Sequence, residues 1–163
     1  LNWMNVDVET FDVMMRAAMV HRIGVSYPLP KLPERLRERL SYHLQIFKDH
    51  IAPVLPTATL LSLTDSPFRG NRGERNSAWQ LTSNLNSVNE VHLVISLKLE
   101  NSAQSAKFKP TQLEANQRYV VVDLETHNSS TVLGKELTGE LLSEIAGNKN
   151  SWIVEIRPEK ARL

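Results

Sequence analysis

The spacing of apolar residues changes near residue 56 of this 163-residue chain. Before that point, apolar side chains recur every three or four positions, which is typical of one face of an α-helix. Beyond it they alternate with polar side chains, which is typical of a β-strand with one buried face. The pattern therefore predicts an α+β protein with two domains, residues 1–55 and 56–163, and a boundary at Pro53–Pro56.

Two amphipathic helices are predicted in the first domain. The first spans Val8–Val20, and Asp7 or Asp12 near its start is favourable at the positive end of the helix dipole. Its apolar face contains Phe11, Met14, Met15, Ala18 and Met19. The second begins at Pro33 and ends before Pro53, since proline suits a first turn but cannot continue a helix. Its apolar stripe contains Leu36, Leu40, Leu44, Phe47 and Ile51, and its water-facing residues are Arg35, Arg37, Glu38 and Arg39.

A short apolar run, Ile23–Tyr27, lies between these helices and is bounded by Pro28. Its length predicts a strand, and a strand between two helices is typical of a β/α repeat with a parallel sheet. One such unit cannot close a sheet, so its partner strands would have to come from other polypeptide. In a β/α barrel the active site lies at the C-terminal ends of the strands, which makes Ser26 and Tyr27 the candidate substrate-binding residues.

Several short strands are predicted in the second domain. The clearest runs from Val91 to Leu99, where alternation separates an apolar inner face from a polar outer face. The others are Leu60–Thr64, Ala78–Ser83, Tyr119–Leu124 and Trp152–Ile156. Lys107–Asn116, which contains Pro110, is predicted to be a loop. Short strands separated by Asn, Ser, Gly and Pro turns indicate an antiparallel β-sandwich.

The segment Leu133–Ala146 has an ambiguous pattern. Its apolar residues Leu137, Leu141, Leu142 and Ile145 have helical spacing. Gly134 and Gly139 interrupt that spacing, and Gly147 closes it. On pattern alone, a helix and a loop followed by a strand are equally compatible with the segment.

The composition is that of a soluble globular protein, with 41% hydrophobic and 23% charged residues. A net charge of +1 argues against nucleic acid or an anionic membrane as the main partner, because both select for clustered positive charge. The absence of cysteine excludes disulfides and thiolate zinc sites without fixing the compartment. No apolar run reaches transmembrane length. Because the chain starts at Leu1 without an initiator methionine, we expect it to be a piece of a longer protein.

Three carboxylates near the first predicted helix, Asp7, Glu9 and Asp12, are candidates for the paired acid–base chemistry of glycoside hydrolysis. Acidic residues at a helix start more often cap the helix, and we favour that role. His21 and Arg22 stand directly before the predicted strand, where a single histidine is rarely catalytic.

Two other groups resemble known binding sites without completing one. His43 and His50 lie seven positions apart on one predicted helix, but no third ligand accompanies them, so no metal site is predicted. The stretch Arg69–Arg75 is rich in glycine and arginine. It lacks the Gly-Lys-Ser/Thr ending of a phosphate-binding loop, and we interpret it as a surface turn.

The order of these parts resembles the C-terminal end of melibiase-type α-galactosidases. The similar segments are PERLRERLSYHLQIFKDHIAPVL, LLSLTDSP, AWQL, RYVVVDLET, GKELTGELL and SWIVEI. In that family the last β/α unit of a catalytic barrel leads into an antiparallel β-sandwich. The helix between them ends in a tyrosine-lysine or similar pair in the family, and Phe47-Lys48 takes that place in this chain. Gly134–Leu137 is similar to a closing segment of the family with the pattern Gly-X-Glu-Leu. This similarity favours a loop and a strand in the ambiguous region.

The resemblance implies the last β/α unit of a TIM-like barrel and a C-terminal sandwich, taken from a retaining glycosidase. Such enzymes act by double displacement with two carboxyl groups, without a metal or organic cofactor. The family's two catalytic aspartates belong to earlier barrel strands, and no stretch here matches their motifs. We therefore expect this chain alone to be inactive. Its partner would be a carbohydrate bound through the barrel, and the sandwich could also supply contacts in a homo-oligomer.

The alternative is a stand-alone β-sandwich module that binds carbohydrate without catalysis. Trp79, Tyr119 or Trp152 would then serve as the platform on which a sugar ring stacks.

Overall fold

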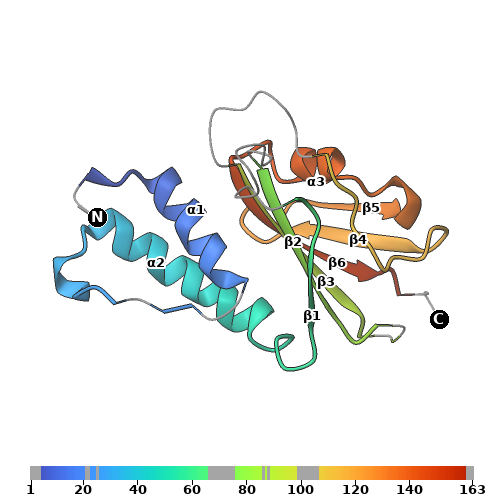
Figure 1. The fold of residues 1–163 in the computed structure, drawn as a ribbon, viewed down its shortest axis with the longest axis horizontal. Coiled ribbons are helices and arrows are strands. Elements are labelled where there is room, and N and C mark those ends of the chain that lie inside the picture. Colours follow the sequence, from blue (N-terminus) through green and yellow to red (C-terminus); the bar gives the residue numbers. More distant parts are fainter. Residues whose placement is uncertain are drawn as a thin grey trace.

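The fold is an antiparallel β-sheet with helices packed against both faces (Figure 1). The structure is a computed structural model that describes residues 5–20, 23–24, 26–65, 76–85, 87, 89–98 and 107–160. Helices α1 and α2 lie together on one face of the sheet, and α3 lies against the other. His21, Arg22 and the predicted surface turn Arg69–Arg75 lie outside the described residues.

The first predicted helix is confirmed as α1, Val8–Met19. The Asp7 carboxylate caps it by accepting a hydrogen bond from the Thr10 backbone N–H at 2.7 Å, as expected for an N-terminal aspartate. Phe11 packs towards α2 and Met19 packs towards the sheet. α1 therefore contacts both neighbours through one continuous apolar side.

The second predicted helix is confirmed as α2, Glu34–Ile46, which continues as the π-helix η3, Phe47–Ile51. Its predicted stripe is wrong at Leu44, which is 40% exposed, while His43 and Ile46 are buried. A row of residues spaced by four drifts about 40° around the helix at each step, so it leaves the buried face after two steps. Steps of three, from Leu40 to His43 and Ile46, restore the buried face.

The strand predicted at Ile23–Tyr27 is not formed by the described residues of that segment, and Val25 lies outside them. The prediction is wrong because Ile23 and Tyr27 pack against the apolar cluster between α1 and α2 instead of pairing in a sheet. The 3-10 helix η2, Leu29–Lys31, then leads into α2. The described residues consequently contain no parallel β/α unit.

The described strands form a six-stranded sheet in the order β1-β2-β3-β6-β4-β5, and all neighbours are antiparallel. Their bounds are β1 Thr59–Ser62, β2 Asn76–Ser83, β3 Val91–Lys98, β4 Arg118–Asp123, β5 Ser129–Leu133 and β6 Ser151–Pro158. The antiparallel β-architecture and the strands predicted after residue 56 are confirmed. β5 was not predicted, because its sequence SSTVL shows no alternation of apolar and polar residues.

Both faces of the sheet are buried. On the face that meets α1 and α2, the apolar core includes Leu93, Ile95 and Ile153. On the opposite face it includes Val94, Tyr119 and Trp152, covered by α3 and by the segment that contains Phe108. The predicted polar outer face of β3 is therefore wrong, since its residues His92 and Ser96 are buried beneath that second cover.

Part of the ambiguous segment forms the helix α3, Gly139–Ile145, preceded by the 3-10 turn η4, Gly134–Glu136. The expectation of a loop and a strand is therefore wrong. Gly139 does not interrupt the helix because it directly follows the N-cap Thr138, whose hydroxyl accepts from the Leu141 N–H at 3.2 Å. Gly147, with φ of 76°, lies beyond the end of the helix and stops it.

A third apolar cluster lies between α1 and α2 themselves. It is made of Val6, Phe11, Met15, Leu32, Leu36 and Leu40. The helical layer thus has an apolar core separate from the one it shares with the sheet.

Candidate functional site

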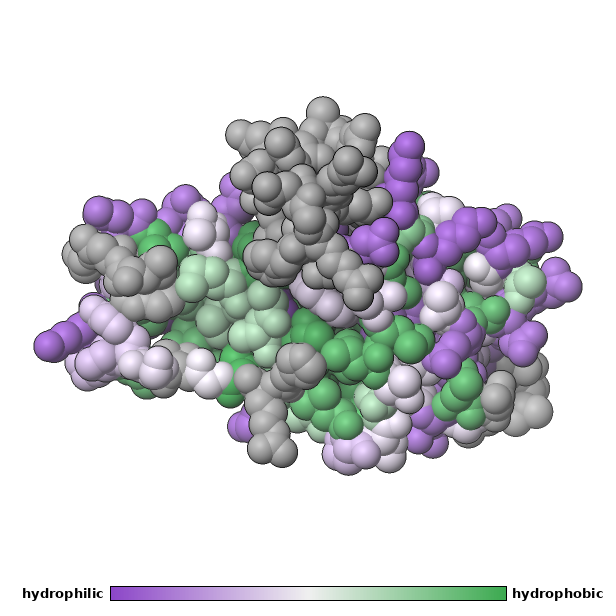
Figure 2. Space-filling model, in the orientation of Figure 1, coloured by the Kyte–Doolittle hydropathy of each residue, from purple (hydrophilic) through white to green (hydrophobic). Residues whose placement is uncertain are grey.

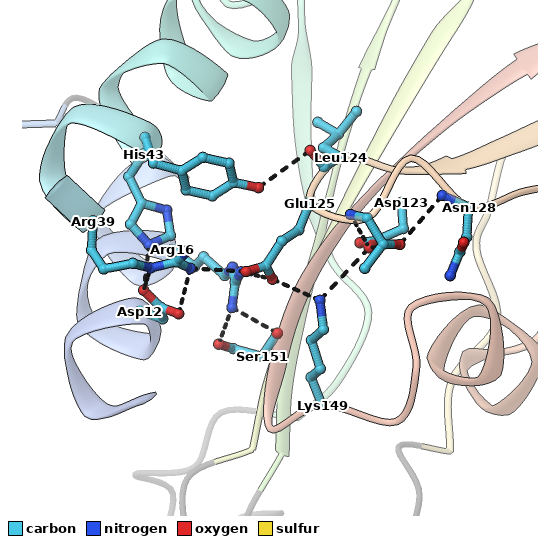
Figure 3. A network of polar contacts seen from close by, with 12 residues as sticks. Asp12, Arg16, Arg39, His43, Asp123, Leu124, Glu125, Asn128, Lys149 and Ser151 are labelled. Atoms are coloured by element: carbon cyan, nitrogen blue, oxygen red, sulfur yellow. Dashed lines mark hydrogen bonds and ion pairs between the residues drawn. The ribbon is translucent and has the colours of Figure 1, made fainter. Parts of the chain in front are cut away.

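A network of charged side chains connects the helical layer to the sheet (Figure 3). We call it the helix–sheet junction. Its members are Asp12 and Arg16 of α1, Arg39 and His43 of α2, Glu125 after β4, and Lys149 and Ser151 at the start of β6. These residues come from four separate parts of the chain.

Asp12 is the acceptor at the helical end of the junction. Arg39 donates to its carboxylate from Nε at 2.8 Å and from Nη2 at 2.6 Å, and His43 Nε2 lies 2.7 Å from Oδ1. Burial would raise the pKa of Asp12, but the hydrogen bonds from His43 and Arg39 outweigh it and lower the pKa from 3.8 to about 2. Asp12 is therefore ionised and fully engaged at neutral pH.

Glu125 is the acceptor at the sheet end. It receives hydrogen bonds from Arg16 Nη2 at 2.7 Å, Arg39 Nη2 at 2.9 Å and Lys149 Nζ at 2.8 Å. Burial would raise its pKa, but these cations lower the pKa from 4.5 to about 2. Asp123 shapes the turn that presents Glu125. Because arginine can donate in two directions at once, Arg39 bridges both carboxylates.

Arg16 is the most deeply buried cation of the junction, with 3% of its surface exposed. Its Nη1 donates to the backbone oxygen of Ser151 at 2.7 Å and to the Ser151 hydroxyl at 2.6 Å. Burial of a guanidinium is unfavourable unless acceptors replace the lost water. Glu125 and Ser151 together supply acceptors for both of its terminal nitrogens, while Nε has no hydrogen-bond partner among the described residues.

His43 is completely buried beneath the junction. Its pKa is lowered, mainly by burial and also by the charge of Arg16, despite the favourable contact with Asp12. The imidazole is therefore neutral at pH 7, and we assign its proton to Nε2 because that nitrogen faces the Asp12 carboxylate. Among the described residues, Nδ1 has no hydrogen-bond partner.

Tyr42 closes the side of the junction. The guanidinium of Arg39 lies 4.6 Å from the centre of its ring, and its hydroxyl donates to the Leu124 backbone oxygen at 3.3 Å. Burial raises the pKa of Tyr42 to about 12, so the phenol is neutral. Tyr42 is thus a packing and hydrogen-bonding element of the junction.

The junction has the chemistry of a structural connection. Its carboxylates are ionised and paired, and His43 is shielded from solvent, so none of them is free to exchange a proton with a substrate. The other candidate acids have separate partners, since Asp7 caps α1 and Glu9 accepts from the Asn150 amide. The capping role favoured for these three acids is confirmed for Asp7 and wrong for Glu9 and Asp12, whose side chains contact other parts of the chain.

The two histidines of the predicted second helix do not share a site. His50 Nδ1 lies 3.0 Å from Glu155 Oε2 on β6, whereas His43 contacts Asp12. In the described ranges, no group of three or more His, Cys, Asp or Glu side chains is placed to hold a metal ion. None of the helices described combines the length and apolar character needed to cross a bilayer.

Ser26 and Tyr27, the predicted substrate-binding residues, line a pocket of about 260 Å³ between α1, α2 and the segment that joins them. The rest of the lining consists of Phe11, Met14, Met15, Ala18, Gly24, Leu32 and Leu40. A sugar site needs several convergent polar groups, whereas this lining is mostly aliphatic and aromatic. The role of Ser26 and Tyr27 in substrate binding stays a prediction.

Two of the three aromatic residues predicted as the platform of the alternative module are buried. Tyr119 and Trp152 are 1% and 3% exposed, and Trp79 is half-buried against the core shared with the helices. A sugar ring stacks only on an exposed aromatic face. Tyr119 and Trp152 are therefore core residues, which corrects that interpretation.

Sequence reasoning missed the roles of Arg16, Glu125 and Lys149, and it wrongly placed Arg39 in water. A local signal did exist for the helical members. Asp12 precedes Arg16 by four positions and Arg39 precedes His43 by four, which places each pair on one side of its helix. The sheet members carry no comparable signal, because only the fold brings them to the helices.

The chain was compared with known proteins. No family model matches it, and no curated protein matches its sequence. Among solved structures, the α-galactosidase from Lactobacillus brevis matches with a TM-score of 0.65 and 16% sequence identity. The match covers 91% of this chain and 20% of that chain. The likeness shows a shared fold, and this chain spans about a fifth of the solved protein.

Proposed function

We propose that this chain is the C-terminal portion of a retaining glycoside hydrolase similar to α-galactosidases. The catalytic barrel would lie in polypeptide that precedes this chain, with the helices of residues 1–55 packed against it and residues 56–163 as the antiparallel β-domain behind it. The observation that carries the proposal is the fold match, which includes the helices as well as the sheet, since it covers 91% of the chain. If the chain were instead a stand-alone module built on the sheet, its helical layer would not be expected to match the α-galactosidase structure.

The open apolar surface of the helical layer supports this proposal. Met14, which lines the pocket, is 37% exposed, and Figure 2 shows hydrophobic surface over the helices and near β1. Contiguous exposed apolar surface on a soluble protein commonly marks an interface. In the proposed parent, barrel elements that precede this chain would cover it, and the domain would contribute packing and contacts between copies.

The proposed reaction is hydrolysis of a terminal α-galactoside by double displacement. One carboxylate attacks the anomeric carbon while a carboxylic acid protonates the leaving oxygen, and water then releases the sugar. Both groups would lie upstream of this chain. Asp12 and Glu125 do not fit these roles, because each is already paired with arginine.

The test is hydrolysis of nitrophenyl α-galactoside by this chain and by the longer protein encoded with its upstream sequence. We expect activity in the longer protein and none in this chain. The Asp12→Asn variant of the longer protein should keep its KM, because Asp12 does not touch substrate. Activity of this chain alone, lost in Asp12→Asn, would reject the proposal, as would a longer protein that lacks glycosidase activity.

A further inference from the structure

We propose that the helix–sheet junction is acid-sensitive: uptake of a proton by His43 in mildly acidic solution releases the α1–α2 layer from a sheet that stays folded. This inference does not depend on the glycosidase assignment. It rests on the charge balance of the junction, on the position of His43 within it, and on the separate cores of the two layers.

The charges of the junction balance when His43 is neutral. Within the described residues, the cations of the junction are Arg16 from α1, Arg39 from α2 and Lys149 before β6. The anions are Asp12 from α1, Asp123 at the end of β4 and Glu125 beyond it. Three positive and three negative charges give a net charge of zero. A proton on His43 would add an uncompensated positive charge at a site with little access to water.

The surroundings of His43 make that proton costly. Nε2 already uses the nearest acceptor, Asp12, and in the described part of the chain Nδ1 has no acceptor in reach. The edge of the Tyr42 ring packs beside the imidazole at a centroid distance of 5.4 Å. A second N–H on the ring would therefore be buried without a partner, which favours any conformation that lets water reach it.

The direction of the pH effect follows from the same geometry. Burial lowers the pKa of His43 in the closed state below its ordinary value of 6.5. The open state therefore binds the proton more tightly, so the closed state is fully favoured above about pH 6.5 and progressively disfavoured as the pH falls below it. The change lies in the range where histidine is the usual switch.

The helical layer can separate without unfolding the whole protein because each layer has a core of its own. α1 and α2 share the cluster that includes Phe11, Leu36 and Leu40, and the sheet keeps the cluster under α3 that includes Val94 and Leu142. The apolar core that α1, α2 and η3 share with the sheet would be opened.

A second contact between the layers also contains a histidine. His50 Nδ1 faces Glu155 Oε2 at 3.0 Å, and Arg157 donates to the other oxygen of the same carboxylate. The two histidines must therefore be tested separately.

The experiment is amide hydrogen exchange of the chain near pH 7.5 and near pH 5, corrected for the intrinsic pH dependence of exchange. We expect protection of α1 and α2 to fall at least about tenfold at the lower pH, while protection of β3 and β6 is retained. His43→Gln keeps an N–H donor for Asp12 but cannot gain a proton, so it should abolish the loss. His127→Asn, at an exposed position with φ of 59°, is the matched control and should behave like the unmodified chain.

Three results would overturn the proposal. One is an equal loss of helix protection in His43→Gln, and another is simultaneous loss of protection in helices and sheet. The third is an NMR titration of the unmodified chain in which the His43 ring gains its proton while the amides of α1 and α2 stay protected from exchange. This measurement decides the question even if His43→Gln does not fold. His50→Gln should retain the acid response, and its loss in that variant would also overturn the proposal.

Discussion

Arg16 and Ser151 lie 135 residues apart in the sequence, yet Arg16 Nη1 donates to both the backbone oxygen and the hydroxyl of Ser151, at 2.7 and 2.6 Å. This contact fixes α1 against the first residue of β6. β6 lies between β3 and β4, so the helical layer is attached at the centre of the sheet and not at an edge strand.

Replacement of Arg16 should be strongly destabilising. Arg16→Met leaves Glu125 with one cation fewer and leaves the acceptors of Ser151 unpaired in a buried site. We expect a loss of about 3 kcal/mol in the free energy of unfolding, measured by urea denaturation. Arg118→Met, which breaks an exposed ion pair with Glu159, is the control and should cost under about 0.5 kcal/mol. Equal losses in the two variants would contradict the structural role of the junction.

The carboxylates of the junction should make the protein sensitive to strong acid. Asp12 and Glu125 have a pKa of about 2 in the folded protein against 3.8 and 4.5 ordinarily, so they stabilise the fold above those ordinary values. That stabilisation is lost as the pH falls towards 2. We expect the urea concentration at the midpoint of unfolding to decrease as the pH is lowered below about 4.5. The measurement is made in His43→Gln, which removes the contribution of that histidine. Adding Asp12→Asn to this variant should make the urea midpoint depend less steeply on pH. An unchanged pH dependence would contradict the pairing of these carboxylates.

Gly134 should tolerate no side chain. A Cβ at this position would overlap the backbone oxygen of Glu114 and approach Tyr119 Cε2 to 3.2 Å. Because the overlap is with backbone, relief requires the chain to move, and Gly134→Ala should cost about 1–3 kcal/mol in urea denaturation. Gly24→Ala is the control, since its Cβ would meet no described atom within 4 Å. A stable Gly134→Ala protein would show that this turn is placed differently.

Leu142 anchors α3 to the sheet and is completely buried. Leu142→Ala should lower the free energy of unfolding by about 2–4 kcal/mol, from lost apolar burial and the cavity left behind. The exposed Leu85→Ala is the comparison, with an expected change within about 0.5 kcal/mol. A small effect at Leu142 would indicate that α3 does not pack as described.

Much of the fold could be predicted from the sequence because apolar periodicity is a local signal. The spacing from Phe11 to Met19 and the alternation from Val91 to Leu97 identify an element without knowledge of its neighbours. Tertiary context decided the failures. Ile23 and Tyr27 are half-buried against the apolar cluster between α1 and α2 instead of pairing in a sheet, and the polar face of β3 is covered by α3 and the segment around Phe108.

The junction could be predicted only in part, because its halves are distant in sequence. The helical pairs Asp12–Arg16 and Arg39–His43 have a spacing that can be recognised, whereas Glu125 lies 109 residues from Arg16 and follows an ordinary strand. Only the antiparallel placement of β4 beside β6 brings Glu125 and Ser151 to the same helices.

If this chain is the C-terminal portion of a glycoside hydrolase, polypeptide that precedes it should cover the open face of α1. The most direct measurement is thiol labelling of Met14→Cys, since the chain has no native cysteine. A maleimide reagent should label this position quickly in the chain alone and at least about tenfold more slowly in the longer protein, while Leu85→Cys in the β2–β3 turn is labelled at similar rates in both. Equally fast labelling of Met14→Cys in the two proteins would contradict the claim.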